Sequence, residues 1–177
     1  MKRKKACYTQ FKKGESRKNM PISFVKDREE KGKCVREILL DLPEWFGLPE
    51  STEKYIEESS KLPLWCEKRK EEYLGFITLS QTSEDTAEIY CMGIKKDYHH
   101  QGLGTKLFKE AEGYAAKHYK YLQVKTVDEG HYSIYDQTIC FYESLGFSRL
   151  EVFPNLWDEW NPCLVLVKKL EIGRAHV

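Results

Sequence analysis

The chain has 177 residues, of which 41% are hydrophobic and 32% are charged, and its net charge is +1. These values suit one globular domain with one core, and they exclude a disordered chain. The apolar runs, such as residues 163–167, are too short to cross a bilayer, and no apolar segment follows the basic start, so we expect no membrane span and no signal peptide.

The two ends of the chain differ from the rest. Residues 1–20 carry eight Lys or Arg and one Glu, a net charge of +7, which leaves −6 for the remainder. A basic arm can bind nucleic acid, but without apolar periodicity a solvated tail is the better interpretation. Residues 172–177 resemble a translated sequencing adapter. We therefore expect one domain at residues 21–170, between a disordered extension at 1–20 and a non-native tail at 171–177.

Hydrophobic spacing predicts the elements of the first half. Helical spacing of apolar residues is followed by Pro43 and Gly47, which break the helix. A charged turn at residues 68–72 separates two alternating runs, which is typical of a hairpin. We expect strands at residues 21–26, 64–68 and 73–80, and helices at residues 30–42 and 51–59.

The second half alternates strands and helices. We expect a helix at residues 102–119 with an apolar face, and another at 138–145 that ends at Gly146, a favourable residue after a helix. Strands are expected at residues 86–95, 121–127, 147–152 and 163–169. This mixed order predicts a single α/β (α+β) domain around one mixed sheet.

The cysteines and histidines do not form a metal site in sequence. The six cysteines lie far apart, without a Cys-x-x-Cys pair, and no Cys/His group has zinc spacing. We expect reduced cysteines of a cytoplasmic protein, and no metal. The histidines His99, His100, His118 and His131 lie on different expected elements.

The segment of residues 87–105 carries the chemistry. An expected buried strand runs into a charged loop, and Gly102 and Gly104 then open a helix. Free N–H groups and the positive dipole end at a helix N-terminus make an anion site, suited to a pyrophosphate. A P-loop needs Gly-Lys-Ser/Thr, but Thr105 precedes Lys106 here, and a dinucleotide fingerprint needs glycine where Leu107 stands. A helix that merely begins with glycines is the remaining alternative.

Two motifs resemble those of the GNAT family of N-acetyltransferases. Residues 99–104, His-His-Gln-Gly-Leu-Gly, are similar to the family's acetyl-CoA motif Gln/Arg-x-x-Gly-x-Gly/Ala, although His99 departs from it. Residues 141–147, Phe-Tyr-Glu-Ser-Leu-Gly-Phe, look like the family's Phe-Tyr-Glu-x-x-Gly-Phe. The family often has Asn seven residues before the tyrosine, where this chain has Tyr135. The resemblance extends over about residues 72–170.

The resemblance implies a fold and a co-substrate. It implies a mixed, mostly antiparallel sheet of about six or seven strands flanked by helices, in which the motif strand and the next parallel strand splay apart. Acetyl-CoA is the implied co-substrate, with its pantetheine arm in that gap. The implied coenzyme-binding residues are Met92, Gly93, Ile94, His99, His100, Gln101, Gly102, Leu103, Gly104 and Thr105.

Transfer of an acetyl group to an amine needs a base, an oxyanion donor and an acid. Glu88 lies fourteen residues before Gly102, where the resemblance implies the glutamate base of histone-acetylating members; an edge carboxylate is the alternative. The oxyanion donor is expected near Met92 or Gly93, unless Gly93 serves packing. Tyr142 is the implied acid, unless its ring only packs on the coenzyme.

Helical geometry predicts how Tyr142 is oriented. Phe141 and Leu145, four residues apart, are expected to face the core. Tyr142 is then expected about 100° round the helix, toward the sulfur of the coenzyme.

The acceptor is not identified by the sequence. In the family, the first helices and the last hairpin loop flank the acceptor, and here both are aromatic and acidic, which would suit a cationic amine. Packing is the alternative role of these residues. The implied substrate-binding residues are Glu44, Trp45, Phe46 and Trp157. A small amine, a protein lysine and a protein N-terminus all stay open as acceptors, as do a non-catalytic acyl-CoA sensor and a homodimer.

Overall fold

The computed structural model describes residues 20–171, so the predictions for residues 1–19 and 172–177 lie outside the described residues. The described part forms one seven-stranded sheet in the order β1-β2-β3-β4-β5-β7-β6. The strands are β1 (Ser23–Val25), β2 (Leu64–Arg69), β3 (Glu72–Gln81), β4 (Thr86–Ile94), β5 (Tyr121–Val127), β6 (Ser148–Asp158) and β7 (Asn161–Lys169). The α-helices are α1 (Arg28–Leu40), α2 (Pro49–Ser59), α3 (Leu103–Ala115) and α4 (Ser133–Ser144).

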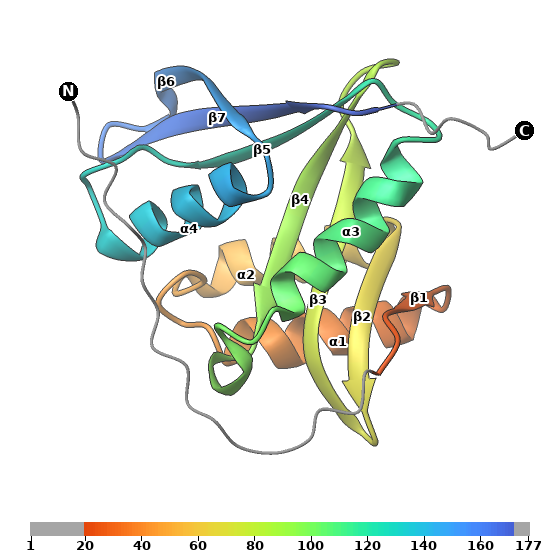
Figure 1. Ribbon diagram of the computed structural model, residues 1–177. Helices are drawn as coiled ribbons and strands as arrows, with labels where there is room; N and C mark the ends of the chain where they lie inside the picture. Colours follow the sequence, from red (N-terminus) through yellow and green to blue (C-terminus); the bar gives the residue numbers. More distant parts are fainter. Residues whose placement is uncertain (1–19, 172–177) are drawn as a thin grey trace, which may run out of the picture.

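The helices cover the sheet on two sides. In Figure 1, α1 and α2 lie behind strands β2 to β4, whereas α3 crosses in front of them and α4 lies below β5 and β7. Two hydrophobic clusters match these layers, one joining α3 and α4 to the sheet and one joining α1 and α2 to it. Only β4 and β5 pair in parallel; the other strand pairs are antiparallel. The expected fold class is therefore confirmed.

The two parallel strands form a fork. They pair only from Thr86 opposite Tyr121 to Glu88 opposite Gln123. Beyond Glu88, β4 runs down in Figure 1 and β5 turns aside, with α4 in the angle between them. The splayed strands that the resemblance implies are thus present, and the fork begins at the residue proposed as the base.

A β-bulge in β4 sets which way its side chains point. Thr78 of β3 lies opposite Cys91, but the next residue, Leu79, lies opposite Ile89, so Tyr90 is the extra residue. The hydroxyl of Thr78 donates to the carbonyl of Cys91 at 3.1 Å and accepts from its N–H at 3.2 Å. As a result, both Tyr90 and Cys91 pack on the α1–α2 side.

Several element boundaries differ from the sequence predictions. Helix α3 ends at Ala115 rather than 119, because the chain tightens into a turn in which Lys117 donates to Tyr114. Helix α4 begins at Ser133 rather than 138. The residue before it, Tyr132, makes no capping hydrogen bond through its side chain, so the sequence holds no local signal for this helix start. Strand β6 continues to Asp158 through irregular pairing with β7, where a loop was expected.

Two further features of the described residues bear on function. No helix among them combines the length and apolar character that a membrane crossing needs. Within residues 20–171, no group of three or more His, Cys, Asp or Glu side chains could hold a metal ion.

Candidate active site

The N-terminus of α3 has no side-chain cap. Gly102 caps the helix with a left-handed φ of +79°, a conformation that glycine adopts without steric cost, and it supplies no side-chain cap. The N–H of Lys106 donates to the carbonyl of Gly102 at 3.1 Å. The first turn holds no acidic residue. The N–H groups of residues 103–105 therefore point outward at the positive end of the helix dipole.

Gly104 lets this helix start lie close to its neighbours. A Cβ atom added there would come within 3.0 Å of Ile94 of β4 and 3.0 Å of Phe141 of α4. Because these distances are shorter than nearly all Cβ contacts in proteins, a larger residue would require its neighbours to shift by a few tenths of an ångström. The two glycines thus differ in purpose: Gly102 makes the turn, and Gly104 allows α3, β4 and α4 to converge.

His99 is part of the loop rather than of the anion site. Its Nε2 lies 2.5 Å from the carbonyl oxygen of Ile94, and its ring packs edge-on against Trp45 at 5.9 Å and His100 at 6.2 Å. His100 adopts a positive φ of 56°. The imidazole that replaces the family's Gln or Arg therefore braces the β4–α3 loop, so contact with an anion falls to the backbone.

The backbone of β4 offers donors to the gap. The N–H groups of Cys91 and Lys95 both bond toward β3, to Thr78 at 3.2 Å and to Leu74 at 2.9 Å. Successive N–H groups of a strand point to opposite edges. The N–H groups of Met92 and Ile94 consequently face the gap between β4 and β5.

Gly93 has a packing role in the fold. Its N–H faces β3, as those of Cys91 and Lys95 do, and therefore points away from the gap between β4 and β5. A Cβ atom added there would come within 3.0 Å of Ile38, 3.2 Å of Leu42 and 3.2 Å of Phe76. Gly93 therefore brings α1 close to β4, and Met92 is the better candidate for the oxyanion donor.

Tyr142 faces the gap from within the core. Its side chain is 6% exposed and its hydroxyl lies 4.0 Å from the thioether sulfur of Met92, a weak acceptor. Burial raises the pKa of Tyr142 well above its usual range, and the nearby Cys91 adds to the rise. Phe141 and Leu145 pack against the core as expected, although they are only partly buried, whereas Tyr142, expected about 100° round the helix from them, is itself a buried member of the core.

Glu88 is held at the point of the fork. Its Oε2 accepts from the Nε2 of Gln123 at 2.6 Å and lies 3.0 Å from the Nζ of Lys125. The Glu88 side chain is 12% exposed. The candidate base is therefore a largely buried carboxylate, and both of its side-chain partners come from β5.

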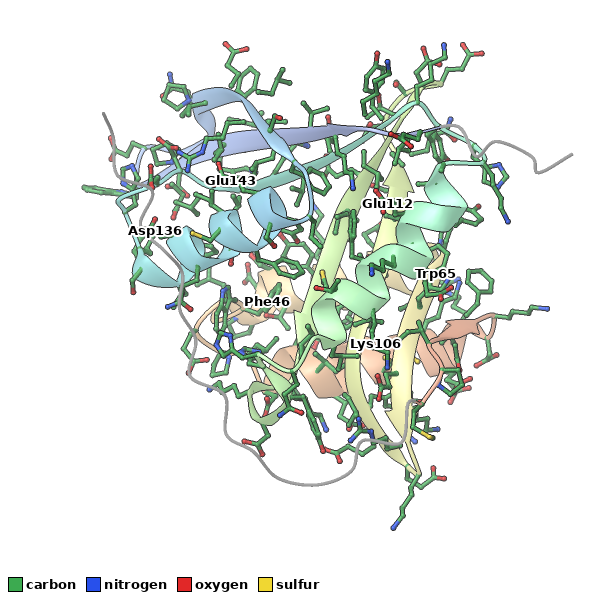
Figure 2. The ribbon with its side chains drawn as sticks, viewed as in Figure 1. Phe46, Trp65, Lys106, Glu112, Asp136 and Glu143 are labelled. Carbon is green, nitrogen blue, oxygen red and sulfur yellow. The ribbon has the colours of Figure 1, made fainter. Side chains whose placement is uncertain are left out.

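The predicted acceptor residues divide into three places. Glu44 pairs with Lys96 at 2.6 Å, and Trp45 packs on His99, so both lie against the β4–α3 loop. Phe46, labelled in Figure 2, instead packs edge-on against Tyr55 of α2 at 5.5 Å. Trp157 lies on the edge strand β6 and is 46% exposed.

Sequence reasoning missed four residues near the fork. The Tyr55 ring lies 5.6 Å from that of Tyr90, and Gln123 and Lys125 hold Glu88. Burial raises the pKa of Tyr90 to about 12. Tyr90 lies inside the motif strand and could have been singled out. The other three come from α2 and β5, and only the fold brings them to Glu88.

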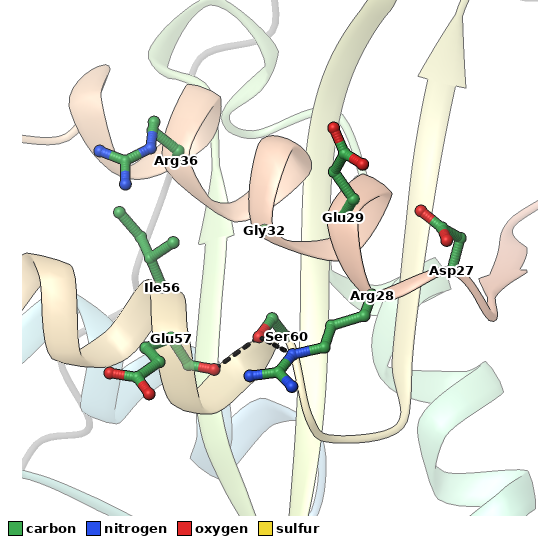
Figure 3. A pocket seen from close by; sticks show the side chains of 8 residues that line it. All are labelled: Asp27, Arg28, Glu29, Gly32, Arg36, Ile56, Glu57 and Ser60. Atoms are coloured by element: carbon green, nitrogen blue, oxygen red, sulfur yellow. Dashed lines mark hydrogen bonds between the residues drawn. The ribbon is translucent and has the colours of Figure 1, made fainter.

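A separate hollow lies between α1 and α2. It encloses about 540 Å³ and is lined by side chains of both helices and their caps, of mixed charge (Figure 3). Arg28 donates to the hydroxyl of Ser60 there at 3.4 Å. None of its lining residues belongs to the fork, so the hollow is not part of the candidate active site.

Comparison with known proteins identifies the family. The chain matches the profile of the acetyltransferase (GNAT) family over residues 33–147. No curated protein matches the chain. A putative GNAT acetyltransferase from Desulfovibrio desulfuricans is similar in fold, with a TM-score of 0.72, 17% identity, and coverage of 85% of this chain and 99% of that one.

Two further solved structures share the fold. The aminoglycoside 6'-N-acetyltransferase from Enterococcus faecium has a TM-score of 0.65 at 21% identity, covering 88% of this chain and 99% of that one. A GNAT acetyltransferase from Elizabethkingia anophelis with acetyl-CoA bound has a TM-score of 0.63 at 19% identity, covering 87% and 100%. Because the family profile covers more than half of the sequence, the chain belongs to the acetyltransferase (GNAT) family.

Proposed function

We propose that this chain is an N-acetyltransferase that moves the acetyl group of acetyl-CoA directly to a primary amine. The observation that carries the proposal is the fork, where the open start of α3, the N–H groups of Met92 and Ile94, and the hydroxyl of Tyr142 converge. Family membership supports acetyl transfer as the general activity.

The residues present suit the coenzyme. The N–H groups of residues 103–105 would bind the pyrophosphate, aided by the helix dipole and by the lack of acidic side chains in that turn. The N–H groups of Met92 and Ile94 would donate hydrogen bonds to the pantetheine arm and to the thioester oxygen, in the same way as they would donate to a neighbouring strand. The close packing at Gly104, against Ile94 and Phe141, keeps the start of α3 beside the donors of β4.

Each side chain at the fork has a step to perform. Glu88 would take the proton of the acceptor ammonium, which frees the nitrogen to attack the thioester carbon. As the N–C bond forms, the N–H of Met92 would stabilise the charge on the oxygen. As the C–S bond breaks, Tyr142 would give its proton to the sulfur. Its raised pKa keeps the phenol protonated at neutral pH, so it is available as an acid.

Release of free thiol from acetyl-CoA tests the function. The full chain is incubated with acetyl-CoA and a panel of primary amines, with no amine as the control. We expect thiol release that requires an amine and is matched by an acetylated product in mass spectrometry. Tight CoA binding by calorimetry without any transfer would contradict the enzyme and favour the sensor alternative.

A further inference from the structure

Opposite charges face each other at the fork. The Nζ of Lys125 lies 3.0 Å from the Oε2 of Glu88. Leu122 and Val124 of β5 pack in the cluster with α3 and α4, so the alternate residue Lys125 projects from the other face of the sheet. Ala87 and Ile89 do the same for Glu88 on β4. The pair therefore lies on the α1–α2 side of the fork.

Both charged groups keep capacity for a ligand. Lys125 has three N–H donors, and among the described residues its one ion pair is with Glu88. Its side chain is 32% exposed. Of the two Glu88 oxygens, only Oε2 has a hydrogen-bond or ion-pair partner within residues 20–171. One carboxylate oxygen and two ammonium hydrogens therefore stay open side by side.

Three other carboxylates of the expected acceptor regions are already engaged. Glu44 pairs with Lys96, and Asp41 accepts from the Lys96 N–H at 2.8 Å. Asp158 accepts from the N–H groups of Trp160 and Asn161 in its own turn. A ligand with several ammonium groups would also meet the positive charge of Lys125. The charge pattern instead fits one cation beside one anion.

The walls beside the pair are aromatic. Tyr90 follows Glu88 on the same face of β4, and its ring contacts that of Tyr55, which contacts Phe46. All three rings are partly buried. Flat apolar walls beside a charge pair suit a ligand with a hydrophobic side chain.

We propose that the acceptor is an α-amino acid with a hydrophobic side chain, whose ammonium binds Oε1 of Glu88 and whose carboxylate binds Lys125. The inference rests on the proposed acetyl transfer for its chemistry. The ammonium passes one proton to Glu88, the N–C bond forms, the C–S bond breaks, and the sulfur takes a proton from Tyr142. The second proton that leaves the nitrogen returns to the tyrosinate, and Glu88 releases its proton to solvent. The products are the N-acetyl amino acid and CoA.

Matched pairs of acceptors test the role of Lys125. The ratio of kcat/KM for L-phenylalanine to that for 2-phenylethylamine, which lacks only the carboxylate, is measured by thiol release. A hydrogen-bonded charge pair predicts a ratio of about 10 to 100 in the parent. The ratio should fall to about 1 in Lys125→Gln and be retained in Lys125→Arg. Lys120→Gln, directly before the same strand and in an exposed pair with Asp85, is the matched control and should keep the parent ratio.

Two results would contradict the proposed amino-acid acceptor without contradicting the proposed acetyl transfer. The first is transfer to both acceptors with a parent ratio near 1, and the second is a high ratio that survives Lys125→Gln. Calorimetry separates a failure of the chemistry from a failure of the site. If L-phenylalanine binds the CoA-loaded protein in a way that depends on Lys125, but no acetyl group is transferred, the proposed function is wrong and the amino-acid site is supported. No binding and no transfer would sink both.

Discussion

The proposed coenzyme side and the proposed acceptor side of the fork differ in the chemical groups that they offer to a ligand. The coenzyme side uses backbone N–H groups: the first turn of α3 and the gap-facing donors of Met92 and Ile94. The acceptor side uses side chains: Glu88 and Lys125 from two strands, and Tyr55 from a helix. A backbone site depends on glycines and on a helix start, whereas a side-chain site depends on which strands lie side by side.

The largest expected effect is at Tyr142, between the two sides. Tyr142→Phe removes only the hydroxyl, so the transfer rate should fall by about 10²- to 10⁴-fold, the range of general acid catalysis. CoA affinity should change little, because the buried ring remains. Stopped-flow thiol release and calorimetry measure the two quantities. An unchanged rate would assign protonation of the thiolate to water.

Glu88→Gln tests the acceptor side alone. The amide keeps the shape but cannot take a proton, so we expect a fall of about 10²-fold, the lower end for a general base. Steady-state kinetics of thiol release measure it. Glu53→Gln, which only breaks an exposed pair with Arg36, is the control. Equal rates in the two variants would refute the base role.

Gly104→Ala tests the packing that supports the coenzyme side. The added methyl group would overlap Ile94 and Phe141, and such overpacking costs about 1–3 kcal/mol of unfolding free energy. Urea unfolding measures the loss. Gly102→Ala meets no atom within 4 Å but is strained by its positive φ, so it separates strain from overlap. A neutral Gly104→Ala would show that α3 can move away from α4.

The smallest expected effect is the contribution of Tyr90, on the acceptor side, to the loss of stability at alkaline pH. Burial raises the pKa of Tyr90 from about 10 when unfolded to about 12 in the fold. Between these values only the unfolded chain loses the proton, so stability should fall as pH rises from 10 to 12. Tyr90→Phe should show a shallower fall in Tm over this window. An identical slope in the variant would show that Tyr90 titrates normally.

The sequence predicted the two sides unequally, for a physical reason. Gly102 and Gly104 stand within three residues of each other at a helix start, so local spacing was enough to predict an anion site there. Tyr142 was found through its motif, but its burial comes from the packing of α4 against the sheet and α3, which the motif does not encode. Lys125 reaches Glu88 only because β5 lies beside β4 for three residues. No spacing along the chain encodes that contact.

The most direct test of the account is CoA binding at the start of α3. Thr105→Glu places a carboxylate in the first turn, where the pyrophosphate would bind, and Thr105→Gln is the uncharged control of equal size. We predict that calorimetry gives a CoA dissociation constant at least about tenfold weaker for Thr105→Glu than for Thr105→Gln, a cost of about 1.4 kcal/mol. Equal affinities for the two variants would contradict a coenzyme site at this helix.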